Sequence, residues 1–113
     1  MHELTVIENI MEISLQVARE NKLSRITVIN LDVGKMQHLN ESIMQHGFDA
    51  AKQGTTAGEA SLKLNWLPVK LKCNECHHIF TSADMKLFCP HCGSKDTNIV
   101  QGTELNIKSI EGE

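Results

Sequence analysis

All four cysteines of the 113-residue chain stand in two pairs, in the segments CNEC and CPHC. Two residues separate the members of each pair, so both sulfurs of a pair can converge from one tight turn. Four thiolates satisfy the tetrahedral preference of Zn(II) and leave no open coordination position. We expect no export signal, and in a chain without one reducing conditions disfavour disulfides. The sequence therefore predicts a closed, structural zinc site formed by Cys73, Cys76, Cys89 and Cys92.

The residues around the cysteines leave two alternatives open. Three histidines lie beside the cysteines: His77, His78 and His91. We expect them to be exposed to solvent. The alternative is that a histidine replaces a cysteine as a zinc ligand when the pH falls. Phe80 and Phe88 are expected to form a small core for this segment. A zinc-ribbon adaptor that binds nucleic acid or protein is the alternative function. Acidic and basic residues nearly balance here, which disfavours binding to phosphates, so we expect no nucleic-acid partner.

A second set of donors stands at the first residues, MHEL. We expect no signal peptide, because Glu8 and Glu12 interrupt the first apolar pattern, and we expect the bulky His2 to preserve Met1. A metal ion could then be chelated by three nitrogen donors: the Met1 amine, the His2 backbone nitrogen and the His2 imidazole. The Glu3 carboxylate could bind the ion from the side. Planar nitrogen donors suit Ni(II) or Cu(II). A surface role without metal is the bland alternative for a terminal histidine.

Composition limits the class of protein. Apolar residues make up 41% of the chain and the net charge is -3, as in a soluble globular protein. No apolar run approaches the roughly 20 residues that cross a bilayer, so we expect a cytoplasmic protein with no membrane partner. Four thiolates leave no position for water or substrate, and no set of nucleophile and base is evident, so we expect no enzyme.

Apolar periodicity predicts the elements that hold these donors. Ile7, Ile10 and Met11 recur at helical spacing, which predicts a helix over residues 6–21 after an extended lead-in at residues 2–5. A second helix should begin after Asn40 as its N-cap and bury Ile43, Met44, Gly47, Phe48 and Ala51. Alternating segments predict strands at 24–34, 60–67 and 103–111.

This order predicts an α+β fold, in which a small β-sheet packs with two helices and a small four-cysteine, zinc-ribbon-like module precedes the last strand. The expected domains are residues 1–68 with 101–113, which would carry the terminal metal site, and residues 69–100, which would hold zinc. The last strand is expected to return to the first sheet.

The chain resembles the HypA/HybF family, the hydrogenase and urease nickel-incorporation proteins. The resemblance rests on segments distributed through nearly the whole chain, in order: MHEL, LDVGKM, FDAAKQGT, CNEC, CPHCGS and GTELNIKSIE. Their order and spacing together are specific, whereas each alone is weak.

The resemblance implies a nickel metallochaperone that carries Ni(II) and holds a structural Zn(II). His2 would be the primary nickel ligand, with the Met1 amine, the His2 amide and Glu3, and the Asn40 amide oxygen would lend a weak contact. The implied partners are the HypB GTPase and the precursor of the [NiFe]-hydrogenase large subunit. Urease maturation proteins and a homodimer are further expectations from the resemblance.

Overall fold

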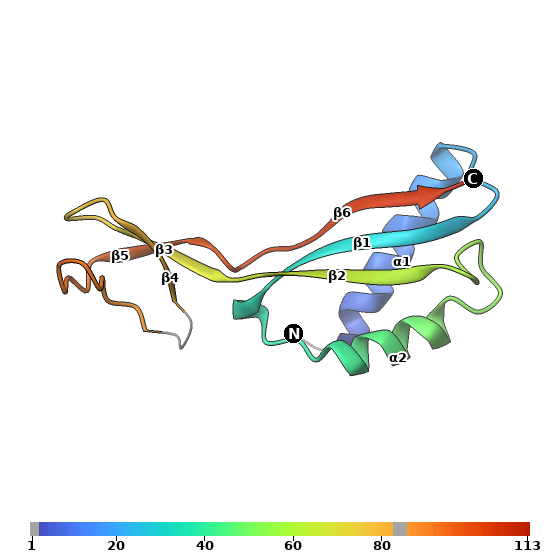
Figure 1. Ribbon diagram of the computed structural model, residues 1–113. Helices are drawn as coiled ribbons and strands as arrows, with labels where there is room; N and C mark the ends of the chain where they lie inside the picture. Colours follow the sequence, from blue (N-terminus) through green and yellow to red (C-terminus); the bar gives the residue numbers. More distant parts are fainter. Residues whose placement is uncertain (1–2, 83–85) are drawn as a thin grey trace. The chain divides into compact units, whose positions relative to one another are not determined.

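The computed structural model describes residues 3–82 and 86–113, and Figure 1 shows its helices and strands. Met1 and His2, which are predicted to bind nickel, thus lie outside the described residues. Two compact units share the chain: one comprises Met1–Asp32, His38–Asn65 and Asn106–Glu113, and the other comprises Val33–Gln37 and Trp66–Leu105. The described residues contain two α-helices and two three-stranded sheets, which confirms the α+β class.

The first unit is built on a sheet with strand order β2-β1-β6. Its strands are β1 (Ile26–Gly34), β2 (Ser61–Leu67) and β6 (Leu105–Gly112). Helices α1 (Glu3–Glu20) and α2 (Glu41–Ala51) lie on the same face of this sheet in Figure 1. Alternate residues of β1 are buried, among them Ile29 and Leu31. The last strand does return to the first sheet, as the sequence predicted.

Hydrogen bonds between β1 and β6 fix their direction. The backbone N–H of Ser24, before β1, donates to the Glu113 carbonyl at 2.6 Å, and the N–H of Gly34, at the end of β1, donates to the Glu104 carbonyl at 2.7 Å. The strands therefore run antiparallel. β1 and β2 run in the same direction in Figure 1, joined through α2.

Helix α1 begins at Glu3, so the extended lead-in predicted for residues 3–5 is wrong. An acidic side chain in the first turn is favourable, because it faces the positive end of the helix dipole. Leu4 also extends the stripe that packs on α2: a Cβ placed on Gly47 would stand 2.7 Å from Leu4 Cδ2 and 3.7 Å from Ile7 Cγ1. Glycine at this position lets the two helices approach closely.

The N-cap predicted for α2 is confirmed, because Asn40 Oδ1 accepts a hydrogen bond from the Ile43 N–H at 3.0 Å. The predicted apolar face is only partly right. Met44 and Phe48 are buried, but Ile43 is 46% exposed and Ala51 is exposed. With Met44 and Phe48 filling the sheet side of this short helix, its flanking apolar residues turn toward solvent.

The second unit contains the sheet β4-β3-β5, formed by β3 (Val69–Cys73), β4 (Ile79–Ser82) and β5 (Thr97–Gln101). Both neighbours of β3 run antiparallel to it. A 3₁₀ helix, η1 (Lys35–Gln37), joins this unit, since the Met36 N–H donates to the Gly102 carbonyl at 2.9 Å. Val69, Leu71 and Cys73 are buried, as expected for alternate residues of a half-covered strand.

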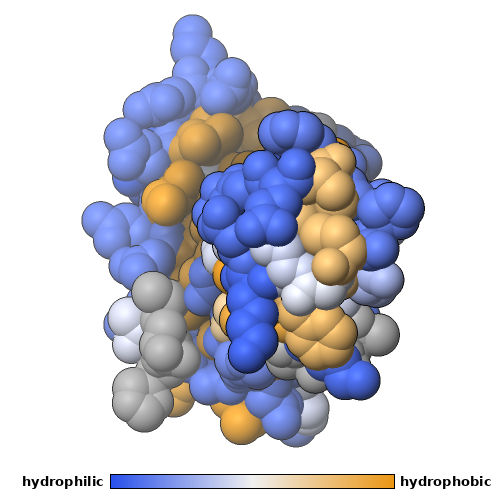
Figure 2. Space-filling model, turned by 90° about the vertical axis from the view of Figure 1, so that its left-hand side faces the viewer, coloured by the Kyte–Doolittle hydropathy of each residue, from blue (hydrophilic) through white to orange (hydrophobic). Residues whose placement is uncertain are grey.

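Several apolar side chains of the second unit face solvent. They are Ile79, Leu87, Phe88, Ile99 and Val100. The core role predicted for Phe88 is therefore wrong, whereas Phe80 is half-buried. In a sheet this small, one buried strand does not offer enough surface to cover every apolar neighbour. Figure 2, which looks onto the left-hand side of Figure 1, shows apolar areas interspersed with polar side chains.

Within residues 3–82 and 86–113, no helix has the length and apolar character needed to cross a membrane.

Candidate metal centre

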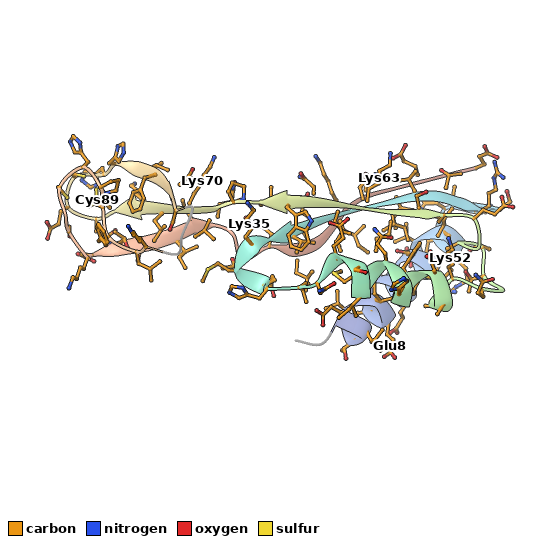
Figure 3. All side chains as sticks on the ribbon, turned by 60° about the horizontal axis from the view of Figure 1, so that its bottom comes forward. Glu8, Lys35, Lys52, Lys63, Lys70 and Cys89 are labelled. Carbon is orange, nitrogen blue, oxygen red and sulfur yellow. The ribbon has the colours of Figure 1, made fainter. Side chains whose placement is uncertain are left out.

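The structure brings the four predicted cysteines together at one end of the β3–β5 sheet, where Figure 3 labels Cys89. Their sulfur atoms all lie within 4.8 Å of one another. Two contacts join the pairs: Cys73 Sγ lies 3.5 Å from Cys92 Sγ, and Cys76 Sγ lies 3.6 Å from Cys89 Sγ. A tetrahedron with metal–sulfur bonds of about 2.3 Å has sulfurs about 3.8 Å apart. The cluster therefore has the size of a tetrathiolate metal site.

Each cysteine pair lies on a turn with the same hydrogen bonds. In the first turn, the Cys73 N–H donates to the His78 carbonyl at 2.9 Å and the His77 N–H donates to the Cys73 carbonyl at 2.9 Å. In the second, the Cys89 N–H donates to the Ser94 carbonyl at 2.8 Å and the Gly93 N–H donates to the Cys89 carbonyl at 2.7 Å. The two turns are thus structural repeats.

The residue after each pair has a left-handed backbone conformation. Gly93 has φ of 76° and His77 has φ of 63°. Glycine adopts this region without steric cost, whereas a side chain makes it unfavourable. Glycine is the residue type expected in such a turn, but His77 was not predicted from the sequence to occupy the equivalent position. Their common place, one residue after the second cysteine of a pair, is the signal that could have revealed it.

The surroundings of the sulfurs separate the pKa values of two thiols. The backbone N–H of Cys76 donates to Cys73 Sγ at 3.5 Å and lowers the pKa of the Cys73 thiol to about 7. At Cys92 the backbone N–H of Ser94 lowers the pKa, but the Cys73 sulfur, burial and the other sulfurs raise it more, to about 12. Four adjacent thiols therefore do not all ionise at neutral pH by themselves. A divalent cation would stabilise all four thiolates together.

The donor set suits Zn(II) as a structural ion. Thiolates are soft ligands, and four of them at tetrahedral separation leave no place for a fifth donor. Cys73 and Cys89 are fully buried, Cys76 is half-buried and Cys92 is exposed. The flanking histidines, His77, His78 and His91, are exposed, as predicted. Their exchange into the metal shell stays a hypothesis.

Of the three N-terminal residues predicted for the terminal site, Glu3 is the one that the structure describes. Its Oε2 accepts a hydrogen bond from the backbone N–H of Asn40 at 2.8 Å. The start of α1 and the N-terminus of α2 are therefore joined by the two residues that the sequence placed near one metal. The Asn40 side chain caps α2 through its Oδ1, and its role as a ligand stays a prediction.

A protein with this fold and cysteine cluster belongs to the class of small two-helix α+β proteins that carry a tetrathiolate module. The family model described as "Hydrogenase/urease nickel incorporation, metallochaperone, hypA" matches residues 1–112. The chain belongs to this family of hydrogenase maturation factors and nickel metallochaperones.

Similar proteins agree over the full length. "Hydrogenase maturation factor HypA" of Roseiflexus sp. (strain RS-1) is 31% identical over 114 residues, which cover 100% of this chain and 93% of that protein. The protein of the same name from Aquifex aeolicus (strain VF5) is 28% identical, covering 98% and 96%. The solution structure of the Ni metallochaperone HypA from Helicobacter pylori aligns with a TM-score of 0.70 at 24% identity, covering 99% and 97% of the two chains. That likeness concerns the fold.

Proposed function

We propose that the chain is a nickel carrier that binds Ni(II) at its first residues and delivers it for the maturation of [NiFe]-hydrogenase, with zinc as a structural ion. The family match over residues 1–112 carries this proposal. We assign nickel binding to residues 1–68 with 101–113 and zinc binding to residues 69–100. The protein is proposed to act in the cytoplasm without catalysing a reaction of its own.

The proposed nickel ligands are the Met1 amine, the His2 amide nitrogen and the His2 imidazole. A terminal amine has a pKa near 7.7–8.0, so nickel can displace its proton at neutral pH. These nitrogens form linked chelate rings in one plane, the arrangement that Ni(II) prefers. An affinity near micromolar, about -8 kcal/mol, would hold the ion and still release it.

Glu3 is proposed to support this site in two ways. Its carboxylate can approach the ion from the side or accept from the His2 imidazole. It also holds the first turn of α1 against α2, since its Oε2 accepts from the Asn40 N–H at 2.8 Å. This bond supports a fixed starting point for the short segment that carries the ligands.

The zinc module is proposed to keep the second unit folded. The unit has a sheet of three short strands, and among its described residues five large apolar side chains are exposed, so apolar burial alone gives it little stability. Binding of a structural zinc ion contributes about 10–16 kcal/mol in small modules.

The proposed partners are a HypB-type GTPase and the precursor of the hydrogenase large subunit, with urease maturation proteins and a second copy of the chain as further partners.

The test is metal analysis and calorimetry on the untagged, zinc-loaded protein and its His2→Ala variant. We expect the parent to bind one Ni(II) in addition to zinc, and the variant to lose nickel while it retains zinc and its circular dichroism spectrum. A His46→Ala variant is the matched control, because His46 is an exposed histidine on α2. Unchanged nickel affinity in His2→Ala would refute the terminal site.

A second preparation with an acetylated N-terminus tests the amine separately. The amine can no longer be a ligand after acetylation, so we expect nickel affinity to fall at least tenfold while zinc binding is unchanged. Salt-dependent retention on DNA, unaffected by either change and without nickel binding, would instead support the zinc-ribbon adaptor.

A further inference from the structure

Two imidazoles stand next to each other beside the sulfur cluster. The ring centroids of His78 and His91 lie 5.4 Å apart, with an angle of 34° between the ring planes. His78 also stacks on Phe80, with centroids 6.3 Å apart and an angle of 11°. Both histidines are exposed. The terminal nickel site and the four-cysteine site use neither of them.

The backbone of each histidine is fixed by a different cysteine turn. The His78 carbonyl accepts from the Cys73 N–H at 2.9 Å. His91 lies inside the second turn, which the bond from the Gly93 N–H to the Cys89 carbonyl closes at 2.7 Å. Because the sulfur contacts join the two turns, the cluster that gathers the cysteines also brings the backbones of the two histidines near each other.

The separation of the rings matches two ligands of one tetrahedral ion. A ring nitrogen lies about 2.0–2.1 Å from such a metal, which places the centroids of two imidazoles roughly 5 Å apart, against about 4.5 Å for neighbouring positions of a square plane. The observed 5.4 Å is closer to the tetrahedral value. Rotation about χ2, which is broad for histidine, can turn one nitrogen of each ring toward a common point.

We propose that His78 and His91 form a second metal site on the zinc-binding unit, which takes an exchangeable divalent ion of the zinc or cobalt type. Neutral imidazole is a good ligand for these ions. Two protein ligands leave the other positions of a tetrahedral ion to water or to a donor from another molecule. The site therefore binds weakly, and it differs in geometry from the planar site proposed at the N-terminus.

The test uses Co(II), whose visible absorption reports tetrahedral coordination, on the full-length zinc-loaded chain. The His2→Ala background removes the proposed terminal site. We expect one Co(II) per chain in addition to zinc, and at least tenfold weaker binding in His78→Gln and in His91→Gln. His46→Gln is the matched control with unchanged binding. Zinc content is measured in every variant, so that loss of the sulfur site is separated from loss of the imidazole pair.

A second measurement on the parent chain needs no substitution in the pair. Paramagnetic Co(II) should broaden the imidazole proton resonances of His78 and His91 before those of His46. The proposal is overturned if the parent binds no Co(II) at millimolar concentration, if both glutamine variants bind like the parent, or if broadening spares the two rings. Loss of binding in His77→Gln with both other variants unaffected would likewise overturn it.

Discussion

Replacing Gly93 by alanine should weaken zinc binding through the backbone alone. Gly93 has φ of 76°, and a Cβ built on it meets no atom within 4 Å, so the substitution causes no clash. The left-handed conformation costs a residue with a side chain roughly 1–2 kcal/mol. Alanine offsets about 0.4–1 kcal/mol of this by restricting the unfolded chain. The net loss is therefore about 1 kcal/mol, or roughly fivefold in the zinc dissociation constant.

The assay is competition with a zinc chelator, because we expect zinc binding to be coupled to the folding of the second unit. His77→Gly is the mirror experiment: His77 has φ of 63° in the equivalent place, so glycine should strengthen zinc binding by a similar or smaller factor. Equal zinc affinity of Gly93→Ala and the parent, or weaker binding by His77→Gly, would refute the equivalence of the two turns.

Three further predictions concern other parts of the chain. Gly34→Ala should destabilise the protein by about 3 kcal/mol in urea unfolding, because a Cβ there would stand 2.0 Å from the Gly102 carbonyl oxygen. A change below about 1 kcal/mol would contradict this close approach. Glu3→Ala should lower stability by about 1 kcal/mol, since it leaves the Asn40 N–H without this acceptor, and an unchanged urea midpoint would count against it. Zinc affinity should fall as pH decreases: the pKa of the Cys73 thiol is lowered from 9.0 to about 7, so its thiolate contributes fully above pH 9 and is lost as pH falls through about 7. Chelator competition between pH 8 and pH 5.5 measures this, and a flat profile would refute it.

Local signals in the sequence predicted local structure well. The N-cap at Asn40 and the strand over Ile26–Gly34 depend on neighbouring residues, and both are present. The start of α1 was predicted too late, because the contact between Leu4 and Gly47 joins segments distant in the chain. Ile43 was predicted to be buried because it is apolar and falls on the helical repeat. It is exposed, because no other element among the described residues covers that side of the short helix.

The cysteine module shows the same limit. The spacing of the cysteines predicted a closed cluster, and the structure gathers the four sulfurs within 4.8 Å. Composition did not predict the sheet β4-β3-β5, since its pairing depends on the register of segments on either side of the cysteines. The left-handed backbone conformation of His77 was likewise not predicted, because sequence rules expect glycine at such a position. The ligands that the sequence placed at Met1 and His2 stay predictions.

The pairing of β1 with β6 has a consequence for how the chain folds. Asn30 Nδ2 reaches Ser109 Oγ at 2.9 Å across 79 positions of sequence, and the whole cysteine module lies between them. Closing so long a loop costs entropy that grows with the logarithm of its length. A metal ion that cross-links the module shortens the free length of this loop before the last strand arrives. Metal supply during synthesis should therefore affect how fast the first sheet is completed.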